Sequence, residues 1–146
     1  MVSTDMDTTT QTPDERTLLR AAGLRVTRPR VAVLTALHER PHADAATVLA
    51  AVRRELPAVS HQAVYDSLHT LTDVGLVRSI QPAGSTARYE IRRDDNHHHL
   101  VCRDCGRTVE IEGPAVERWA DRVAAEHGFT DVSHTLEVFG RCPACA

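Results

Sequence analysis

The chain has no lysine, only four cysteines and few aromatic residues, which make up 3% of its 146 residues. All 17 basic residues are arginine, whose planar guanidinium suits contacts with phosphate groups. No signal peptide or apolar membrane span precedes the cysteines, because the first twelve residues, MVSTDMDTTTQT, are polar. We therefore expect a disordered tail at residues 1–12 and a cytoplasmic protein without membrane contact, in a reducing compartment where structural disulfides are rare.

Charge is distributed unevenly along the chain. Residues 16–93 hold twelve arginines and six acidic residues, a net charge of +6, whereas residues 94–146 hold five arginines and ten acidic residues, a net charge of −5. A length of 146 residues suits one or two small domains. The asymmetry favours a nucleic-acid-binding domain followed by a cation-binding domain.

The four cysteines form two Cys-x-x-Cys pairs, Cys102 with Cys105 and Cys142 with Cys145. Four thiolates in such pairs make a closed tetrahedral site for Zn(II), which stabilises a fold and leaves no open position for catalysis. The alternatives are two disulfides, which a reducing compartment disfavours, and two redox pairs, which would need a βαβ context. The cysteines therefore predict a structural zinc site.

Three consecutive histidines, His97, His98 and His99, precede the first cysteine pair. Side chains alternate between the two faces of a strand, so His97 and His99 point one way and His98 the other. A site made of His97, His99 and nearby carboxylates such as Glu90 and Glu110 suits Fe(II), Mn(II) or Zn(II) better than Cu(I). The alternative is a surface run of histidines that binds nothing, but the neighbouring cysteine pair favours a second metal site.

Four helices are expected before residue 76. The first runs from Pro13 to about Ala22, and Thr27, Asp44 and Ser60 are suitable N-caps for the next three. In the fourth, residues 61–74, an apolar face is expected to point inward, and it consists of Val64, Leu68, Leu71 and Val74. Polar residues such as His61 and Gln62 are left on the outer side, together with Tyr65.

A strand at residues 76–81, a turn at 82–85 and a second strand at 86–92 follow the fourth helix and predict a two-stranded wing. Helices followed by such a wing form the winged-helix variant of the helix-turn-helix. It places its last helix in the DNA major groove and its wing against the backbone or minor groove. The alternative is a small helical domain with a solvated polar face.

The remaining residues predict strands at 98–102, 107–112 and 133–140 and a helix at 114–128, with Trp119 and Val123 in the core. So small a domain buries little surface and needs zinc and a dimer interface for stability. The expected architecture is therefore α+β. A tail at residues 1–12 precedes a winged helix at residues 13–93 and a small α/β dimerisation domain with structural zinc at residues 94–146.

The sequence resembles the ferric uptake regulator family of metal-dependent bacterial repressors over nearly the whole chain after the tail. The resemblance rests on GLRVTRPRVAVL, PHADA, SHQAVYDSLHTLTDVGLV, ARYE, HHHLVCRDCG and the closing CPAC. The sequences of these motifs especially resemble the branch of the family that is encoded beside catalase-peroxidase genes in high-GC bacteria. Members of that branch respond to iron and peroxide. The resemblance implies a homodimer that binds double-stranded DNA at a palindromic operator, with no small-molecule substrate and no enzymatic activity.

The resemblance also implies site residues. The family's structural zinc ligands match Cys102, Cys105, Cys142 and Cys145. The family's regulatory site for Fe(II) or Mn(II), which lies between the two domains, matches His42, Glu90, His97, His99 and Glu110. A further metal site of some members matches His98, Glu117 and His134, although some members have His and Asp where this chain has Asn96 and His98. The residues expected to contact DNA are Arg28, Ser60, His61, Gln62, Tyr65 and Arg88, with Tyr65 against a base.

The expected regulatory ligands lie in both domains, so they can converge on one ion only when the domains close. We therefore expect metal binding to select the closed dimer, in which the two recognition helices are spaced for the half-sites of a palindromic operator. Glu90 favours an iron sensor, because peroxide sensors of the family typically have Asp there; in a peroxide mechanism, His42 and His99 are the candidates for oxidation. The alternatives are a zinc- or nickel-sensing repressor and a zinc-ribbon adaptor that does not bind DNA. The deaminase signature, in which a His-x-Glu precedes Pro-Cys-x-x-Cys, is absent.

Overall fold

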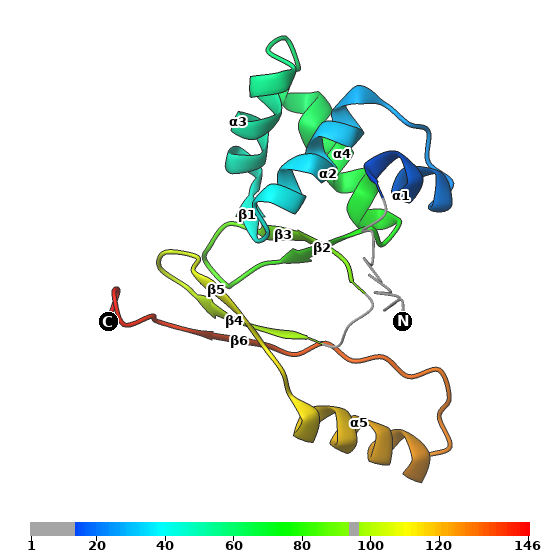
Figure 1. Ribbon diagram of the computed structural model, residues 1–146. Helices are drawn as coiled ribbons and strands as arrows, with labels where there is room; N and C mark the ends of the chain where they lie inside the picture. The colour runs from blue at the N-terminus through cyan, green and yellow to red at the C-terminus, as the bar shows by residue number, and fades with distance from the viewer. Residues whose placement is uncertain (1–13, 94–96) are drawn as a thin grey trace, which may run out of the picture.

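The computed structural model describes residues 14–93 and 97–146. Helices gather at one end of the molecule, strands lie in the middle, and a single helix lies apart at the other end (Figure 1). The N-terminal segment, residues 14–93, contains α1 (Glu15–Ala21), α2 (Arg28–Glu39), β1 (Ala43–Asp44), α3 (Ala45–Glu55), α4 (His61–Asp73), β2 (Val77–Ile80) and β3 (Arg88–Ile91). The C-terminal segment, residues 97–146, contains β4 (His98–Cys102), β5 (Thr108–Ile111), α5 (Pro114–Glu126) and β6 (Glu137–Gly140). The expected tail at residues 1–12 lies outside the described residues, and the division into domains at residue 94 stays a prediction.

Polar side chains begin the first four helices. The three predicted N-caps are confirmed, because the side chains of Thr27, Asp44 and Ser60 each accept a hydrogen bond from the backbone three residues later. The first helix begins at Glu15, two positions after the predicted start at Pro13. Its N-cap is Asp14, whose Oδ1 lies 2.7 Å from the backbone nitrogen of Thr17. Local hydrogen bonding therefore sets where these helices start.

One apolar core holds the N-terminal segment together. Helices α2, α3 and α4 pack around fully buried Leu34, Leu37, Leu68 and Leu71. The inward placement predicted for Val74 is wrong, since this residue is 42% exposed. Helix α4 ends at Asp73, and Val74 is its C-cap, so the helical periodicity no longer applies there.

The wing has the predicted hairpin and one unexpected strand. Strands β2 and β3 pair antiparallel, and Gly84 adopts a φ of +74° in the turn that joins them. The two residues of β1 pair with the other edge of β3, giving the sheet order β1-β3-β2. With this addition, the winged-helix prediction is confirmed.

The C-terminal segment is a second three-stranded sheet with helix α5 held away from it. Strand β4 lies in the centre, antiparallel to β5 and parallel to β6. The third predicted strand is shorter than expected, covering only residues 137–140 of 133–140. Trp119 was predicted in the core but is 57% exposed, because α5 projects beyond the sheet at the end of the molecule (Figure 1). Val123 is partly buried.

None of the helices within residues 14–93 and 97–146 is long and apolar enough to cross a membrane.

Candidate metal centres and nucleic-acid interface

Glu90 is the centre of a cluster of histidines that come from both segments of the chain. Its carboxylate is 4% exposed, and Oε2 lies 2.9 Å from Nε2 of His42 and 3.0 Å from Nε2 of His99. The other oxygen, Oε1, lies 3.3 Å from Nε2 of His97. Strand β3 therefore holds one carboxylate that three imidazoles approach from different directions.

Glu110 on β5 completes the set of five residues expected at the regulatory site. Its Oε1 lies 3.5 Å from Nε2 of His42. The donor atoms form two groups that share Glu90, and within each group the atoms lie no more than 4.8 Å apart. One group consists of His42, Glu90 and His99, and the other of Glu90, His97 and Glu110. Five oxygen and nitrogen donors from two segments fit a divalent first-row metal such as Fe(II) or Mn(II).

Burial and hydrogen bonding act in opposite directions on Glu90. Burial alone would raise its pKa, but hydrogen bonds from His42 and His99 and the charges of His99 and His97 hold that pKa far below its ordinary value. Glu90 is therefore an anion in the absence of any metal. An ionised carboxylate is the form that binds a cation.

His42 reaches this cluster through an unusual backbone conformation. Its φ is +67°, in the left-handed region that residues other than glycine rarely adopt. The backbone N–H of His42 donates to the carbonyl oxygen of Tyr89 at 2.9 Å, which ties His42 to the strand that carries Glu90. The fold thus accepts local strain at a residue whose side chain contacts the buried carboxylate.

Two arginines contact the carboxylates of this cluster, and the sequence analysis missed both. Nη1 of Arg78 lies 3.7 Å from Oε1 of Glu90, and Nη2 of Arg93 lies 2.7 Å from Oε2 of Glu110. The Arg78–Glu90 pair could have been predicted from the sequence, because the two residues lie directly opposite each other in the β2–β3 hairpin. The second pair joins the end of the N-terminal segment to β5, and no local pattern indicates it.

His98 lies on the opposite face of β4 from His97 and His99, as the alternation predicts. Its Nε2 is 2.5 Å from Oε1 of Glu117 on α5, and Nε2 of His134 is 3.4 Å from the same oxygen. The hydrogen bond from His98 is the main cause that lowers the pKa of Glu117. The donor atoms of the three residues lie within 4.8 Å of one another, so this group also has the geometry of a metal site.

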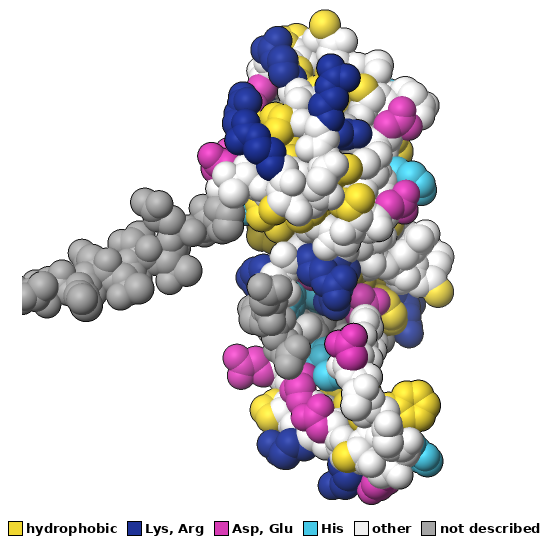
Figure 2. All heavy atoms as spheres, turned by 90° about the vertical axis from the view of Figure 1, so that its right-hand side faces the viewer, with side chains coloured by type: hydrophobic (Ala, Val, Ile, Leu, Met, Phe, Trp, Pro, Cys, Tyr) yellow, Lys and Arg dark blue, Asp and Glu magenta, His cyan; other side chains and the backbone are white. Residues whose placement is uncertain are grey.

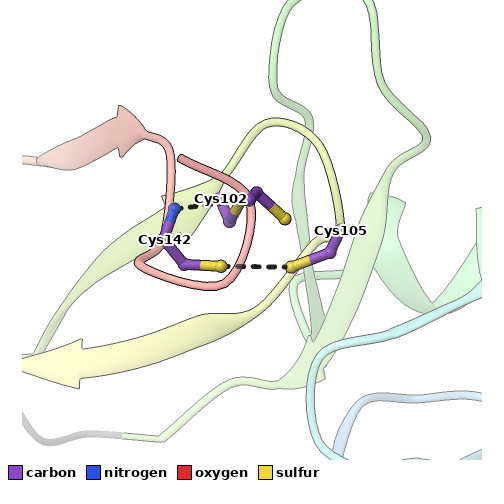
Figure 3. A group of neighbouring side chains, drawn as sticks. Cys102, Cys105 and Cys142 are labelled. Atoms are coloured by element: carbon purple, nitrogen blue, oxygen red, sulfur yellow. Dashed lines mark hydrogen bonds between the residues drawn. The ribbon is translucent and has the colours of Figure 1, made fainter.

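The four cysteines come together at one end of the same sheet, at the end of β4 and in the turns after β4 and β6. All are free thiols, and their sulfur atoms lie within 4.8 Å of one another. The Sγ atoms of Cys105 and Cys142 face each other at 3.7 Å, and the backbone nitrogen of Cys142 lies 3.3 Å from Sγ of Cys102 (Figure 3). Tetrahedral zinc with Zn–S bonds of about 2.3 Å needs sulfur atoms about 3.8 Å apart, so the observed spacing fits Zn(II).

The thiols differ in their readiness to lose a proton. Hydrogen bonds from the backbone N–H groups of Cys105 and Cys142 lower the pKa of Cys102 to about 6. Hydrogen bonds with the thiols of Cys142 and Cys105 raise the pKa of Cys145 to about 12. Cys102 is therefore mainly a thiolate at neutral pH, and the thiolate is the form of cysteine that binds a metal cation.

The residues expected to contact DNA lie mainly on exposed helix positions. Arg28 begins α2 and is exposed, and the rings of His61 and Tyr65 stack at 4.3 Å on the outer side of α4. Ser60 caps α4, and Nε2 of Gln62 donates to Asp66 at 2.7 Å. Several arginine side chains gather on the helical end of the molecule, at the top of Figure 2. This end therefore has the charge that a nucleic-acid backbone requires.

Arg88 has a different environment from the other residues expected to contact DNA. Its guanidinium turns toward the first cysteine pair, where Nη2 lies 3.3 Å from the carbonyl oxygen of Cys105. The structure therefore leaves the DNA contact expected from Arg88 a prediction.

Comparison with known proteins identifies relatives over nearly the whole chain. The model of the ferric uptake regulator family matches residues 21–139. The transcriptional regulator FurA of Mycobacterium tuberculosis strain H37Rv is 52% identical over 134 residues, which cover 92% of this chain and 91% of that protein. The zinc uptake regulation protein of the same strain is 40% identical over 128 residues, covering 87% of this chain and 98% of that protein.

Solved structures agree with these sequence matches. The ferric uptake regulator of Pseudomonas aeruginosa, solved with manganese, has a TM-score of 0.76 and 31% identity and covers 88% of this chain and 98% of that one. The Vibrio cholerae ferric uptake regulator has a TM-score of 0.73 and 30% identity, covering 85% of this chain and 96% of that one. The chain therefore belongs to the ferric uptake regulator family.

Proposed function

We propose that this chain is a metal-dependent, DNA-binding transcriptional repressor that senses iron, with the cluster around Glu90 as its regulatory site. The observation that carries the proposal is that His42 and Glu90 belong to the N-terminal segment, whereas His97, His99 and Glu110 belong to the C-terminal segment. Such a site is complete only when the two segments lie against each other. Binding at the site and the relative position of the segments are therefore linked.

The chemistry of the donor set supports the choice of cation. A bound divalent ion would neutralise the two carboxylates and add coordination bonds that favour the closed arrangement. Imidazole and carboxylate donors suit Fe(II) or Mn(II), whereas the four thiols suit a permanent Zn(II). Relatives of this chain are named for the same metals: they include a ferric uptake regulation protein and a ferric uptake regulator solved with manganese. A zinc-sensing repressor stays the alternative, because a relative named for zinc uptake is 40% identical.

DNA binding is assigned to the helical end of the molecule. Helix α4 would enter the major groove with Tyr65 toward a base, and Arg28 would contact the backbone. A repressor of this kind acts by occupying its operator and needs no catalytic residue or small-molecule substrate. Its site of action is the cytoplasm, and its targets would be iron-homeostasis or catalase-type oxidative-stress genes.

A homodimer is supported by the apolar surface around α5. A groove of about 490 Å³ lies along that helix, and among its lining residues Trp119 is 57% and Phe129 70% exposed. Leu100, Val109 and Val138 expose a further apolar row on the adjacent sheet, each at 40 to 42%. A second copy covering this surface would stabilise a segment that has little core of its own, and two copies would present two α4 helices to a palindromic operator.

The experiment that tests the proposed function is fluorescence anisotropy on labelled DNA from upstream of the gene. Protein loaded with zinc alone is compared with protein that also received Mn(II), or Fe(II) without oxygen. We expect tight binding only after the second metal is added. Equal binding with and without Mn(II) and Fe(II) would refute iron sensing, and binding induced by excess Zn(II) alone would favour the zinc-sensing alternative.

A response to peroxide is a second candidate function. The rings of His42 and His99 lie 5.3 Å apart in an edge-on arrangement, and both approach the same oxygen of Glu90. A reactive oxygen species formed at a ferrous ion between them would meet an imidazole first. Mass spectrometry of the Fe(II) form after brief peroxide treatment should find one added oxygen on His42 or His99. Unmodified histidines would remove this candidate.

A further inference from the structure

We propose that Arg88 is a positioning residue that couples the Cys102–Cys105 pair to the wing, so that the four-cysteine site helps to hold the N-terminal segment in its closed orientation.

Arg88 lies at the start of β3 and reaches across to the C-terminal segment. Its Nη2 donates to the carbonyl oxygen of Cys105 at 3.3 Å. Its Nε is buried and has no hydrogen-bond partner among the described residues. A buried N–H without a partner costs free energy, so the close packing of this guanidinium against the cysteine turn has to offset that cost.

Gly106, directly after the first cysteine pair, is the residue that lets Arg88 approach. It is buried, its φ is +76°, and a Cβ at this position would overlap the guanidinium of Arg88. Glycine is therefore required here twice, once for the left-handed backbone and once for the space that Arg88 fills. The turn and the arginine form a matched pair.

The position of the Cys105 carbonyl depends on the thiol cluster. The turn is closed by the backbone N–H of Gly106, which donates to the carbonyl oxygen of Cys102 at 3.0 Å. Cys105, at the other end of this turn, contacts the C-terminal cysteine pair, because its Sγ lies 3.7 Å from Sγ of Cys142. The same four thiols would bind zinc, so loading of that site fixes the acceptor that Arg88 uses.

Strand β3 then connects the two clusters. Arg88 and Glu90 are two residues apart and so share one face of the strand. One meets the cysteine turn and the other meets His97 and His99, so the C-terminal segment contacts β3 at two points. The Arg93–Glu110 pair lies beyond the other end of β3, so Arg88 adds a contact at the end of the strand that the other contacts leave free to tilt.

Arg88 also has an acidic neighbour, Asp44, on the adjacent strand β1. The two residues are direct partners in the β1–β3 pairing. Hydrogen bonds from Thr47 chiefly lower the pKa of Asp44, and the positive charge of Arg88 lowers it further. Arg88 is thus placed between a carboxylate of its own segment and a carbonyl of the other.

The competing explanation is a contact between Arg88 and a DNA phosphate, which would also make an Arg88→Ala variant bind DNA more weakly. The two explanations differ when no DNA is present. Loss of a positioning contact changes Mn(II) affinity and the shape of the zinc-loaded protein. Loss of a phosphate contact changes neither and lowers the salt dependence of DNA binding by about 0.9 in the log–log slope.

The test compares zinc-loaded wild type, Arg88→Ala and Arg54→Ala, which removes the same charge from an exposed position on α3. Calorimetry measures Mn(II) affinity, small-angle X-ray scattering measures the maximum dimension, and metal analysis measures zinc content, all without DNA. We expect Arg88→Ala to keep its zinc, to bind Mn(II) roughly 3- to 10-fold more weakly, as the net contribution of one solvent-exposed hydrogen bond implies, and to be larger than wild type. Arg54→Ala should match the wild type.

Gly106→Ala perturbs the same contact from the other side and guards against a folding artefact of the first variant. It should weaken Mn(II) binding while zinc stays bound, and adding Arg88→Ala should cause little further loss, because both changes break one contact. Unchanged Mn(II) affinity and dimension in Arg88→Ala would overturn the inference, whatever its DNA affinity. Absence of Mn(II) binding by the wild type would instead refute the proposed regulatory site, and the scattering comparison would still decide the role of Arg88.

Discussion

The cysteine cluster and the histidine–glutamate cluster are assembled in opposite ways. All four cysteines lie in the C-terminal segment, on two short turns closed by their own backbone hydrogen bonds. The five residues of the cluster centred on Glu90 come from β3, β4, β5 and the loops before β1 and β4, and thus from both segments. A cluster contained in one segment can stabilise that segment but cannot report its position. A cluster divided between two segments does report it.

Burial sharpens the same contrast. Glu90 and His99 are buried at 4% and 0% exposure, whereas Cys105 is exposed at the edge of the sheet. Charges that are removed from water need partners, and two of the partners of Glu90, His97 and His99, lie across the boundary between the segments. Opening that boundary would leave Glu90 with fewer partners, so the boundary is sensitive to whatever occupies the site.

The largest effect should follow from breaking the cluster that lies within one segment. Cys142→Ser removes one thiolate, and structural zinc sites contribute about 10 to 16 kcal/mol, so we expect loss of zinc and unfolding of the C-terminal segment. Metal analysis and circular dichroism measure both. Ala144→Ser, which adds the same hydroxyl between the two cysteines, should keep its zinc. A folded, zinc-loaded Cys142→Ser protein would contradict the structural role.

Breaking the divided cluster should leave the fold intact. His99→Ala removes a donor that contacts Glu90, and we expect Mn(II) affinity to fall by at least about 100-fold with zinc content unchanged, because losing even an outer partner of a ligand costs 10- to 100-fold. Calorimetry on zinc-loaded protein provides the measurement. His69→Ala, at a histidine whose side chain is 80% exposed, serves as the matched control. Loss of zinc from His99→Ala would mean that the two clusters are not separate.

The exposed apolar surface gives a third test, which asks whether a partner copy supports the C-terminal segment. Trp119→Asp places a charge in the groove beside α5, and a central aromatic residue typically contributes about 2 to 4 kcal/mol to an interface. We expect the dimer dissociation constant to rise by roughly 30- to 1000-fold, measured by analytical ultracentrifugation. Arg122→Ala on the same helix should have a small effect. An unchanged dimer would assign this surface to a different partner.

The smallest predicted effect lies within the N-terminal segment, at the N-cap of α3. Asp44→Ala removes the N-cap of α3 and should lower the free energy of unfolding by about 1 kcal/mol at neutral pH, while Asp44→Asn keeps the cap. The Thr47 hydrogen bonds hold the pKa of Asp44 below its unfolded value of 3.8. The charge-dependent stabilisation is therefore present above that pH and is lost as pH falls through the folded pKa.

Denaturant unfolding between pH 6 and pH 3 measures this difference. The wild type should lose its advantage over Asp44→Asn on acidification, and a constant difference would contradict the assigned cause.

The features that the sequence predicted correctly depend on local spacing. The caps at Thr27, Asp44 and Ser60 and the alternation of His97, His98 and His99 follow from a few neighbouring residues, and the structure confirms them. The gathering of four cysteines also follows from their paired spacing.

The features that it missed depend on contacts between distant elements. The exposure of Trp119 reflects where α5 projects, and the turn of Arg88 toward Cys105 depends on the packing of one segment against the other. The pairing of Arg93 with Glu110 joins residues that no periodicity connects. A residue's face can be predicted from its element, but its partner across a boundary cannot.

The most direct test of the divided cluster is the Mn(II) affinity of His42→Ala, measured by calorimetry on zinc-loaded protein without DNA. His42 is the imidazole donor that the N-terminal segment contributes to the cluster around Glu90. The account predicts a loss similar to that of His99→Ala, with zinc still bound. Wild-type affinity in His42→Ala would mean that the C-terminal segment binds the ion without the His42 imidazole, and the proposed link between metal binding and closure would lose its basis.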